Sequence, residues 1–318
     1  MPGLVLLAAG FAFVNGMNDG GSLTSMGIKL PGIRPMAAVA MLTGSVILAP
    51  IVLGTAVATT LASRLVQFEA ETAGYALAVA VIVAIGIVLL LSRWGLPTSL
   101  TLAVVGAITG AGFGSGAAVS WRWVAWVLVL AAVAPLVGAV LALGLTRLAY
   151  TSAPPVRMPA FLRQSHRAAF SLQCLAYGVN DGQKMLAVFA LALASVLDPV
   201  RLPAWAFVLL GTCFALGAAV GLRRYGVTLG GGVMPVRPTN AVIAEVSSGV
   251  AVLSTGLLGA PVSMTQAIAG GLVGTGAHDG IRRIRWEQAL KILAAWVVTL
   301  PLALGVATLV VALVVAVS

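Results

Sequence analysis

One polar motif occurs twice in this chain, each time inside a long apolar stretch, and this repetition limits the folds available to it. The copies are Asn15-Gly16-Met17-Asn18-Asp19-Gly20 and Tyr177-Gly178-Val179-Asn180-Asp181-Gly182-Gln183-Lys184. A hydroxyl-rich pair follows in the same order, Pro97-Thr98-Ser99-Leu100-Thr101 and Pro261-Val262-Ser263-Met264-Thr265. Asn18 and Asn180 are 162 residues apart, and Pro97 and Pro261 are 164 apart. The chain therefore reads as two diverged copies of one unit.

The apolar stretches predict an all-α polytopic membrane protein. Of 318 residues, 60% are hydrophobic and only 8% are charged, whereas about 25% are charged in a soluble domain. A spanning helix needs about 20 apolar residues, and ten stretches meet this requirement. In the first half they are residues 4–28, 36–60, 73–92, 97–118 and 123–148, and in the second 168–196, 203–222, 239–258, 260–280 and 287–316.

The order of these segments predicts two inverted-topology repeats. We expect a first repeat over residues 1–149, a basic, proline-containing cytoplasmic linker over 150–167, and a second repeat over 168–318. Because each half crosses the membrane five times, the second copy enters the bilayer upside down relative to the first. Secondary transporters are often built in this way, with their substrate near the midplane between the halves.

The basic residues predict the orientation in the membrane. If the connections alternate sides, fourteen Lys and Arg residues fall on one side and three on the other, with Lys184 left inside a segment. An excess of basic residues marks the cytoplasmic side, so we expect a multi-pass protein of the inner (plasma) membrane with both termini outside. The net charge of +10 is explained by this asymmetry, and no nucleic acid partner is expected.

The Asn-Asp motifs predict ion binding. Their glycines lower helix propensity and favour unwinding, and broken helices are tolerated at membrane depth only where they line a cavity or bind something. Free N–H groups attract anions, and carbonyls with Asp and Asn oxygens suit a hard cation such as sodium. The alternative is a kinked helix whose Asn and Asp cap nearby backbone. The candidate cation-coupling residues are Asn15, Asn18, Asp19, Asn180, Asp181 and Glu245.

The hydroxyl-rich motifs predict an anion site. Each begins with a proline suited to the start of a helix, and its hydroxyls either cap that helix or face a ligand. The alternative is that they bond only to their own helix. The candidate substrate-binding residues are Asp19, Thr98, Ser99, Thr101, Asp181, Lys184, Ser263 and Thr265.

Two further charged residues lie inside apolar stretches. Lys184 follows Asp181 by three residues, so it either pairs with that carboxylate or touches the anion. Glu245 is an intramembrane carboxylate and is by default a functional candidate, as a proton carrier or cation ligand. The alternative for Glu245 is a pair with Arg237 near the cytoplasmic end of its helix.

At these motifs the chain resembles the PiT family of inorganic phosphate transporters, whose halves each carry a Gly-x-Asn-Asp signature. The resemblance covers nearly the whole chain. The resemblance rests on five segments: Gly16 to Asp19, Gly178 to Lys184, Pro97 to Leu102, Pro261 to Gln266, and Trp286 to Pro301. The resemblance implies electrogenic or proton-coupled phosphate symport, with Asp19 and Asp181 essential and the Ser-Thr motifs forming the anion site. A homodimer is expected from the resemblance only.

The chain departs from the family pattern at several positions. Leu100 and Met264 replace a threonine in each hydroxyl motif, and Leu102 and Gln266 replace a histidine. Met41 stands near the place of the family's first-half glutamate, and Ser22 replaces an asparagine that usually follows the first signature. These departures leave open the substrate and the number of coupled cations.

We therefore expect an importer of inorganic phosphate, coupled to sodium or protons by alternating access, in contact with membrane lipid and without a cofactor. The nearest alternative is the same machine carrying sulfate or another oxyanion. A protonated phosphate can donate hydrogen bonds to Asp19 or Asp181, whereas sulfate cannot, so the two carboxylates favour phosphate. A membrane-embedded enzyme acting on lipid phosphates and a receptor or scaffold are less favoured, because neither requires duplicated polar motifs.

Overall fold

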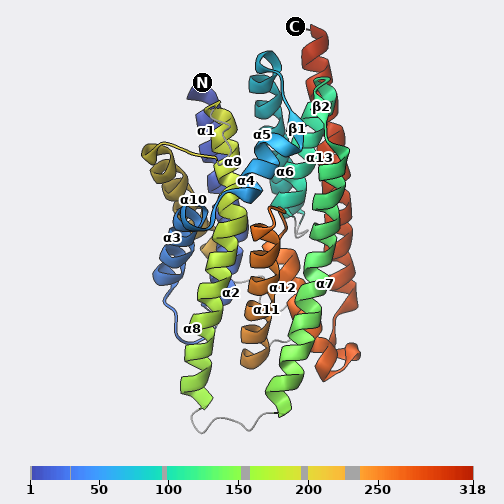
Figure 1. Ribbon diagram of the computed structural model, residues 1–318. Helices are drawn as coiled ribbons and strands as arrows, with labels where there is room; N and C mark the ends of the chain where they lie inside the picture. The colour runs from blue at the N-terminus through green and yellow to red at the C-terminus, as the bar shows by residue number, and fades with distance from the viewer. Residues whose placement is uncertain are drawn as a thin grey trace.

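The structure, a computed structural model, describes residues 2–28, 30–94, 99–151, 158–194, 200–225 and 237–317. It is a helical bundle, and both ends of the chain lie at the upper end of the view in Figure 1. The first half contains α1 (Pro2–Asn15), η1 (Gly16–Gly20), α2 (Gly21–Gly27), α3 (Pro35–Leu53), α4 (Ala56–Thr59), η2 (Thr60–Arg64), β1 (Val66–Gln67), α5 (Ala70–Arg93), α6 (Leu100–Gly114), β2 (Ala118–Val119) and α7 (Trp121–Thr151). β1 and β2 pair antiparallel.

The second half follows a similar order. It contains α8 (Met158–Tyr177), η3 (Gly178–Gly182), α9 (Gln183–Ala192), α10 (Ala204–Tyr225), α11 (Pro238–Leu257), α12 (Met264–Asp279), the 3₁₀ turn η5 (Ile281–Arg283) and α13 (Trp286–Val317). In Figure 1, α5 and α6 lie in the upper half of the view, whereas α11 and α12 lie in the lower half.

The predicted linker over residues 150–167 is helical at both ends. α7 continues through Thr151, and α8 begins at Met158, so most of the predicted linker is helical and residues 152–157 lie outside the described part of the chain. The helix extends because residues 158–166 contain favourable helix formers, Leu, Arg and Gln among them, behind the single proline Pro159 in the first turn.

The two Asn-Asp motifs adopt π-helical turns. η1 joins α1 to α2, and η3 joins α8 to α9, with the flanking residues Asn15, Gly21, Tyr177 and Gln183 all in right-handed helical conformation. The prediction that the helices break at these motifs is therefore wrong. A π turn inserts one extra residue while the helix continues, and such turns are frequent at functional sites.

The glycines of the motifs serve close packing instead. A Cβ atom at Gly16 would meet the carbonyl oxygen of Phe214 on α10, and one at Gly178 would meet the carbonyl oxygen of Ser45 on α3. Each motif thus lies against a helix of the other half. Close glycine contacts between the halves also join α6 to α13 and α12 to α7, where Gly110 approaches Leu304 and Gly270 approaches Pro135.

Six helices of the described residues, α3, α5, α7, α10, α11 and α13, are long and apolar enough to cross a membrane. The helical paths α1–η1–α2 and α8–η3–α9 add two more continuous rods. α6 and α12 contain 15 and 16 residues, which is about 22–24 Å at 1.5 Å per residue, short of a hydrocarbon core of about 30 Å. The prediction of ten spanning segments is therefore not confirmed.

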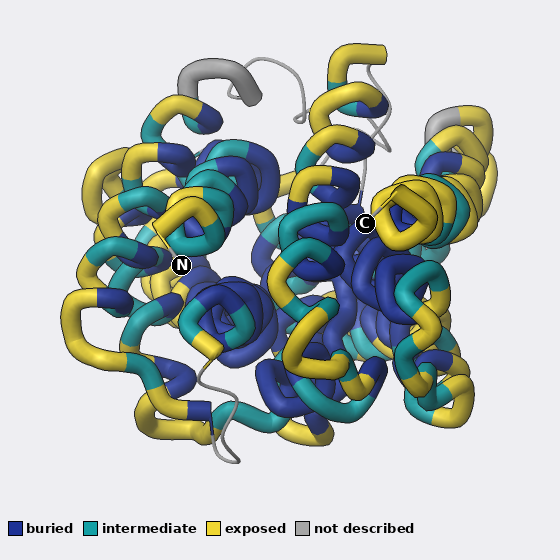
Figure 2. The backbone as a smooth tube through the Cα atoms, turned by 90° about the horizontal axis from the view of Figure 1, so that it is seen from above, coloured by how far each residue is buried: buried dark blue, intermediate teal, exposed yellow. Residues whose placement is uncertain are grey.

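The outer surface of the bundle is apolar and its interior holds the polar motifs. Exposed residues lie on the periphery in the view from above (Figure 2), and they include large hydrophobic side chains such as Leu136, Val140, Leu309 and Leu313. Asn15, Asn180 and Lys184 are fully buried. This distribution is typical of a protein whose outer face contacts lipid.

Candidate functional site

The hydroxyl-rich motifs of the two halves touch each other. Ser99 precedes α6 and Ser263 precedes α12, both in extended conformation, so each helix begins directly after its serine. The Thr101 hydroxyl donates to the Val262 carbonyl oxygen at 3.0 Å. The first turn of α6 and the connection between α11 and α12 therefore meet in the interior of the bundle.

Asn180 of the second π turn holds this connection in place. Its Nδ2 donates to the Val262 carbonyl oxygen at 2.8 Å, and its Oδ1 accepts from the Val262 backbone N–H at 3.3 Å. One amide side chain thus satisfies both backbone polar groups of a buried residue, which lies outside any helix. An unpaired buried backbone group is unfavourable, so the asparagine stabilises the start of α12.

Lys184 lies at the same point and binds three oxygen atoms. Its Nζ is 2.8 Å from Asp181 Oδ1, 2.6 Å from Thr101 Oγ1 and 2.6 Å from the Val262 carbonyl oxygen. The ion pair with Asp181, one of the two alternatives for this lysine, is present, and its side chains are 0% and 1% exposed. The Asp181 Oδ2 atom has no hydrogen-bond partner among the described residues.

Asp19 of the first π turn completes a small group of charges. Its Oδ1 accepts from Asn18 Nδ2 at 2.8 Å, and it lies close enough to Asp181 and Lys184 to interact with both charges. The structure thus brings the two motif aspartates together, as the repeat predicts. With both carboxylates ionised, the group carries two negative charges and one positive charge.

The two motifs are also joined directly at their first residues. The Tyr177 hydroxyl donates to Asn15 Oδ1 at 3.0 Å, and both side chains are fully buried. Asn15 can donate a hydrogen bond to a polar ligand, because its Nδ2 has no partner among the described residues. Tyr177 stands in the place of Asn15 in the second copy, 162 residues on.

The remaining hydroxyls differ between the copies. Ser99 caps α6, since its Oγ accepts from the Leu102 N–H at 3.3 Å, as predicted for a helix start. Ser263 makes no such cap bond, and its Oγ lies 2.9 Å from Thr265 Oγ1. Thr98 lies outside the described residues.

Glu245 has a partner that sequence reasoning did not foresee. Its Oε2 lies 2.9 Å from His166 Nδ1, and His166 Nε2 lies 2.7 Å from the Gly27 carbonyl oxygen. This buried chain of contacts joins α11, α8 and the end of α2. The partner of Glu245 in the structure is His166, not Arg237, and its hydrogen bonds do not reach the motif aspartates.

Gln183 is a further residue whose part was missed. Its Oε1 accepts from the Val57 and Ala58 N–H groups at 2.7 and 3.2 Å, and its Nε2 donates to the Gly54 carbonyl oxygen at 2.8 Å. Gly54 has φ +89° and ends α3, so the glutamine satisfies the backbone where that helix stops. The only sequence signal was its place beside Asp181 in the motif.

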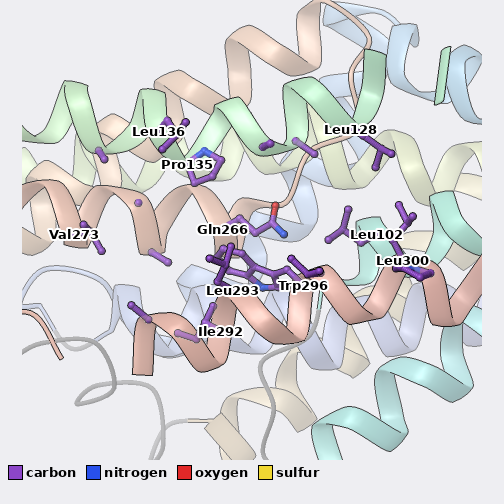
Figure 3. Close-up of a pocket in the computed structure, with 18 residues that line it drawn as sticks. Leu102, Leu128, Pro135, Leu136, Gln266, Val273, Ile292, Leu293, Trp296 and Leu300 are labelled. Carbon is purple, nitrogen blue, oxygen red and sulfur yellow. The ribbon is translucent and has the colours of Figure 1, made fainter. Parts of the chain in front are cut away.

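A cavity of about 490 Å³ lies between α7, α12 and α13 (Figure 3). Its lining includes Leu102, Pro135, Leu293 and Trp296, and Gln266 contributes an amide. Such a lining suits an apolar occupant rather than an anion. Gln266 thus faces an apolar cavity.

Comparison with known proteins decides the family. The phosphate transporter family matches this chain twice, over residues 15–172 and over residues 154–307. The chain belongs to the phosphate transporter family. Each of the two matched ranges contains one Asn-Asp motif.

Relatives within the phosphate transporter family align over nearly the whole chain. A protein of Mycobacterium leprae is 33% identical over an alignment of 315 residues that covers 94% of this chain and 74% of the relative. A protein of Bacillus subtilis is 25% identical over 313 residues, covering 94% of this chain and 92% of the relative. Both are named "Probable low-affinity inorganic phosphate transporter".

A solved structure has the same fold. It is titled "The sodium-dependent phosphate transporter" and superposes with a TM-score of 0.85, covering 99% of this chain and 98% of the other at 17% identity. A similarity at this level of identity establishes the fold of this phosphate transporter family member as that of a known membrane transporter.

Proposed function

We propose that this chain is a secondary active symporter that imports inorganic phosphate together with sodium or protons by alternating access. The observation that carries the proposal is the meeting of both Asn-Asp motifs and both hydroxyl motifs in one buried group, held by Lys184, Asn180 and the Val262 backbone. Membership of the phosphate transporter family and the names of the relatives support phosphate as the substrate.

The charges at the site support coupling to a cation. Asp19 and Asp181 bring two negative charges, and Lys184 neutralises one of them. An isolated charge is strongly disfavoured in a dry interior, so a phosphate anion entering this group requires at least one further positive charge. A co-transported sodium ion or proton would supply it. We assign Asn15, Asn18, Asp19, Asn180 and Asp181 to cation coupling on this basis.

The hydroxyl side chains are assigned to the anion. Ser263 and Thr265 share one hydrogen bond between their hydroxyls, which leaves a second hydroxyl hydrogen to donate to a phosphate oxygen. Ser99 and Thr101 stand at the start of α6, where backbone N–H groups point outward and attract anions. Thr98 belongs to the same proposed set.

The arrangement of the elements supports inverted repeats. α5 and α6 occupy one end of the bundle, and their counterparts α11 and α12 occupy the other (Figure 1). We propose a first repeat over residues 1–149 and a second over residues 168–318. We further propose a multi-pass protein of the inner (plasma) membrane, with both termini outside as the basic residues indicate.

Phosphate uptake into proteoliposomes tests the proposal. Purified protein is reconstituted, sodium and proton gradients are imposed separately, and radiolabelled phosphate is followed with unlabelled sulfate as competitor. Uptake driven by one gradient and insensitive to sulfate is the expected result and identifies the cation. Inhibition by sulfate would indicate a sulfate or general oxyanion carrier, and the absence of flux under both gradients would contradict symport.

A further inference from the structure

The Lys184 ammonium occupies a position that is built like a cation site. Its three neighbours are a carboxylate oxygen of Asp181, the hydroxyl oxygen of Thr101 and the carbonyl oxygen of Val262, all within 2.8 Å of Nζ. Carboxylate, hydroxyl and carbonyl oxygens are the ligands that hard metal cations take from proteins. We propose that Lys184 is a built-in cation, which permanently fills one of two equivalent cation sites and leaves the other for a sodium ion from solution.

The hydrogen bonds require the charged form of this lysine. The Val262 carbonyl oxygen and the Asp181 carboxylate only accept, and the Thr101 hydroxyl uses its own hydrogen to bond Val262 at 3.0 Å. Nζ must therefore donate to all three oxygens. An ammonium group has three N–H donors, whereas a neutral amine has two.

The first half contains the counterpart of this site without a lysine. The 162-residue offset between the motifs relates Asp181 to Asp19 and Lys184 to Ser22, and the 164-residue offset of the hydroxyl motifs relates Thr101 to Thr265. Asp19, Ser22 and Thr265 thus repeat the carboxylate and hydroxyl oxygens, but a short serine stands where the ammonium would be. The built-in ammonium is therefore missing from this copy.

Burial differs between the copies in the direction that this assignment requires. Asp181 and Lys184 are 1% and 0% exposed, whereas Asp19 and Ser22 are 6% and 8% exposed. Thr101 is buried, and its counterpart Thr265 is half-buried. The lysine site is thus more deeply buried than its first-half counterpart.

This inference rests on the proposed symport and specifies its coupling. The Lys184 ammonium stays in its site throughout the transport cycle, so only one sodium ion binds, at Asp19. In an otherwise symmetric transporter without the lysine, two sodium ions would bind. The expected numbers are one sodium ion per wild-type chain and two per chain of the Lys184→Met variant, because the freed Asp181 oxygens take the second ion.

Equilibrium binding of sodium-22 to the purified, detergent-solubilised protein tests these numbers, with size-exclusion chromatography as the check on folding. Sodium should also raise the thermal unfolding temperature of Lys184→Met more than that of the wild type, since a ligand stabilises the folded state that binds it. Lys291→Met removes a lysine that is 55% exposed and should bind one sodium ion like the wild type. Ser22→Lys supplies the first copy with its own ammonium and should bind none.

The outcomes separate the two proposals. Two sodium ions on the wild-type chain, or one on both the wild type and a folded Lys184→Met, would overturn the built-in cation. A wild-type chain that binds no sodium, yet takes up phosphate under a proton gradient, would overturn it while leaving phosphate symport intact. A wild-type chain that binds one sodium ion but transports no phosphate would contradict the proposed function alone.

Discussion

Asn15 and Tyr177 stand at the same place in the two copies of the Asn-Asp motif and are hydrogen-bonded to each other, from the tyrosine hydroxyl to Asn15 Oδ1, at 3.0 Å. Equivalent residues of two symmetric halves meet only close to the axis that relates the halves. This bond therefore marks the centre of the proposed inverted repeat, and it uses different side chains at its two ends.

Removing this bond should destabilise the protein. Tyr177→Phe removes the hydrogen bond that the buried Asn15 Oδ1 accepts. A buried polar atom left without a partner lowers the stability by about 1–3 kcal/mol. We expect a lower thermal unfolding temperature in detergent. Tyr75→Phe is the matched control, because that ring is half-buried on α5 and should unfold like the wild type. Equal unfolding temperatures for the two variants would contradict the predicted importance of the bond.

The motif aspartates should be required for uptake. Asp19→Asn and Asp181→Asn each remove one negative charge from the site, so the coupled cation loses its binding partner. We expect phosphate uptake in proteoliposomes to fall to background while the amount of protein in the membrane is unchanged. Glu71→Gln, an exposed carboxylate in the first turn of α5, should keep full uptake. Wild-type uptake by both aspartate variants would contradict the assignment of Asp19 and Asp181 to the transport site.

The glycines of the π turns should tolerate no side chain. In Gly16→Ala the new methyl group meets the Phe214 carbonyl oxygen on α10, and overpacking of this kind destabilises by about 1–3 kcal/mol. Gly10 lies six residues earlier, on α1, and no atom is close to its Cβ position. Gly10→Ala should therefore stabilise the protein by up to about 1 kcal/mol, because alanine has the higher helix propensity. Thermal unfolding of both variants checks that the two unfolding temperatures shift in opposite directions. Shifts in the same direction would show that α10 can move to accommodate the new methyl group.

The His166–Glu245 pair should behave as a coupled unit. Gly27 O only accepts, so His166 Nε2 carries a proton, and a second proton lies between Nδ1 and Glu245. Removing one partner of a buried pair costs about 3–5 kcal/mol, so we expect His166→Ala and Glu245→Ala each to destabilise strongly.

A double-mutant cycle measures this coupling by thermal unfolding. The His166→Ala, Glu245→Ala double variant should lose much less stability than the sum of the single variants, because neither group is left unpaired. The exposed pair of Lys291 and Glu287 at 2.7 Å serves as control and should change little. Additive losses at His166 and Glu245 would contradict a coupled pair.

The sequence predicted more of the site than of the helices around it. Asp19 and Asp181 were predicted to share one site because transporters with inverted repeats bind their substrate between the halves, and in the structure the two carboxylates are close enough to interact electrostatically. The break at Gly16 and Gly178 was wrong, because composition cannot distinguish a glycine that unwinds a helix from one that lets two helices touch. His166 was assigned to a linker, since a lone histidine among arginines carries no sign of a buried partner 79 residues away.

Contacts through the backbone were beyond sequence reasoning. Val262 supplies the carbonyl oxygen that Thr101, Asn180 and Lys184 all bind, yet its side chain is an ordinary apolar one. Any residue can offer that carbonyl once the chain is placed, so nothing in its identity marks it. The same reasoning explains why Gln183 was overlooked as the partner of the Gly54, Val57 and Ala58 backbone.

The exchange of glycine contacts between halves has a consequence for biosynthesis. η1 packs against α10, which the ribosome completes only about 200 residues after the first motif has been made. Until then the motif with Asn18 and Asp19 lacks its packing against α10. The first half therefore reaches its final packing only after the second half has been made, and each half supplies the surface that buries the motif of the other.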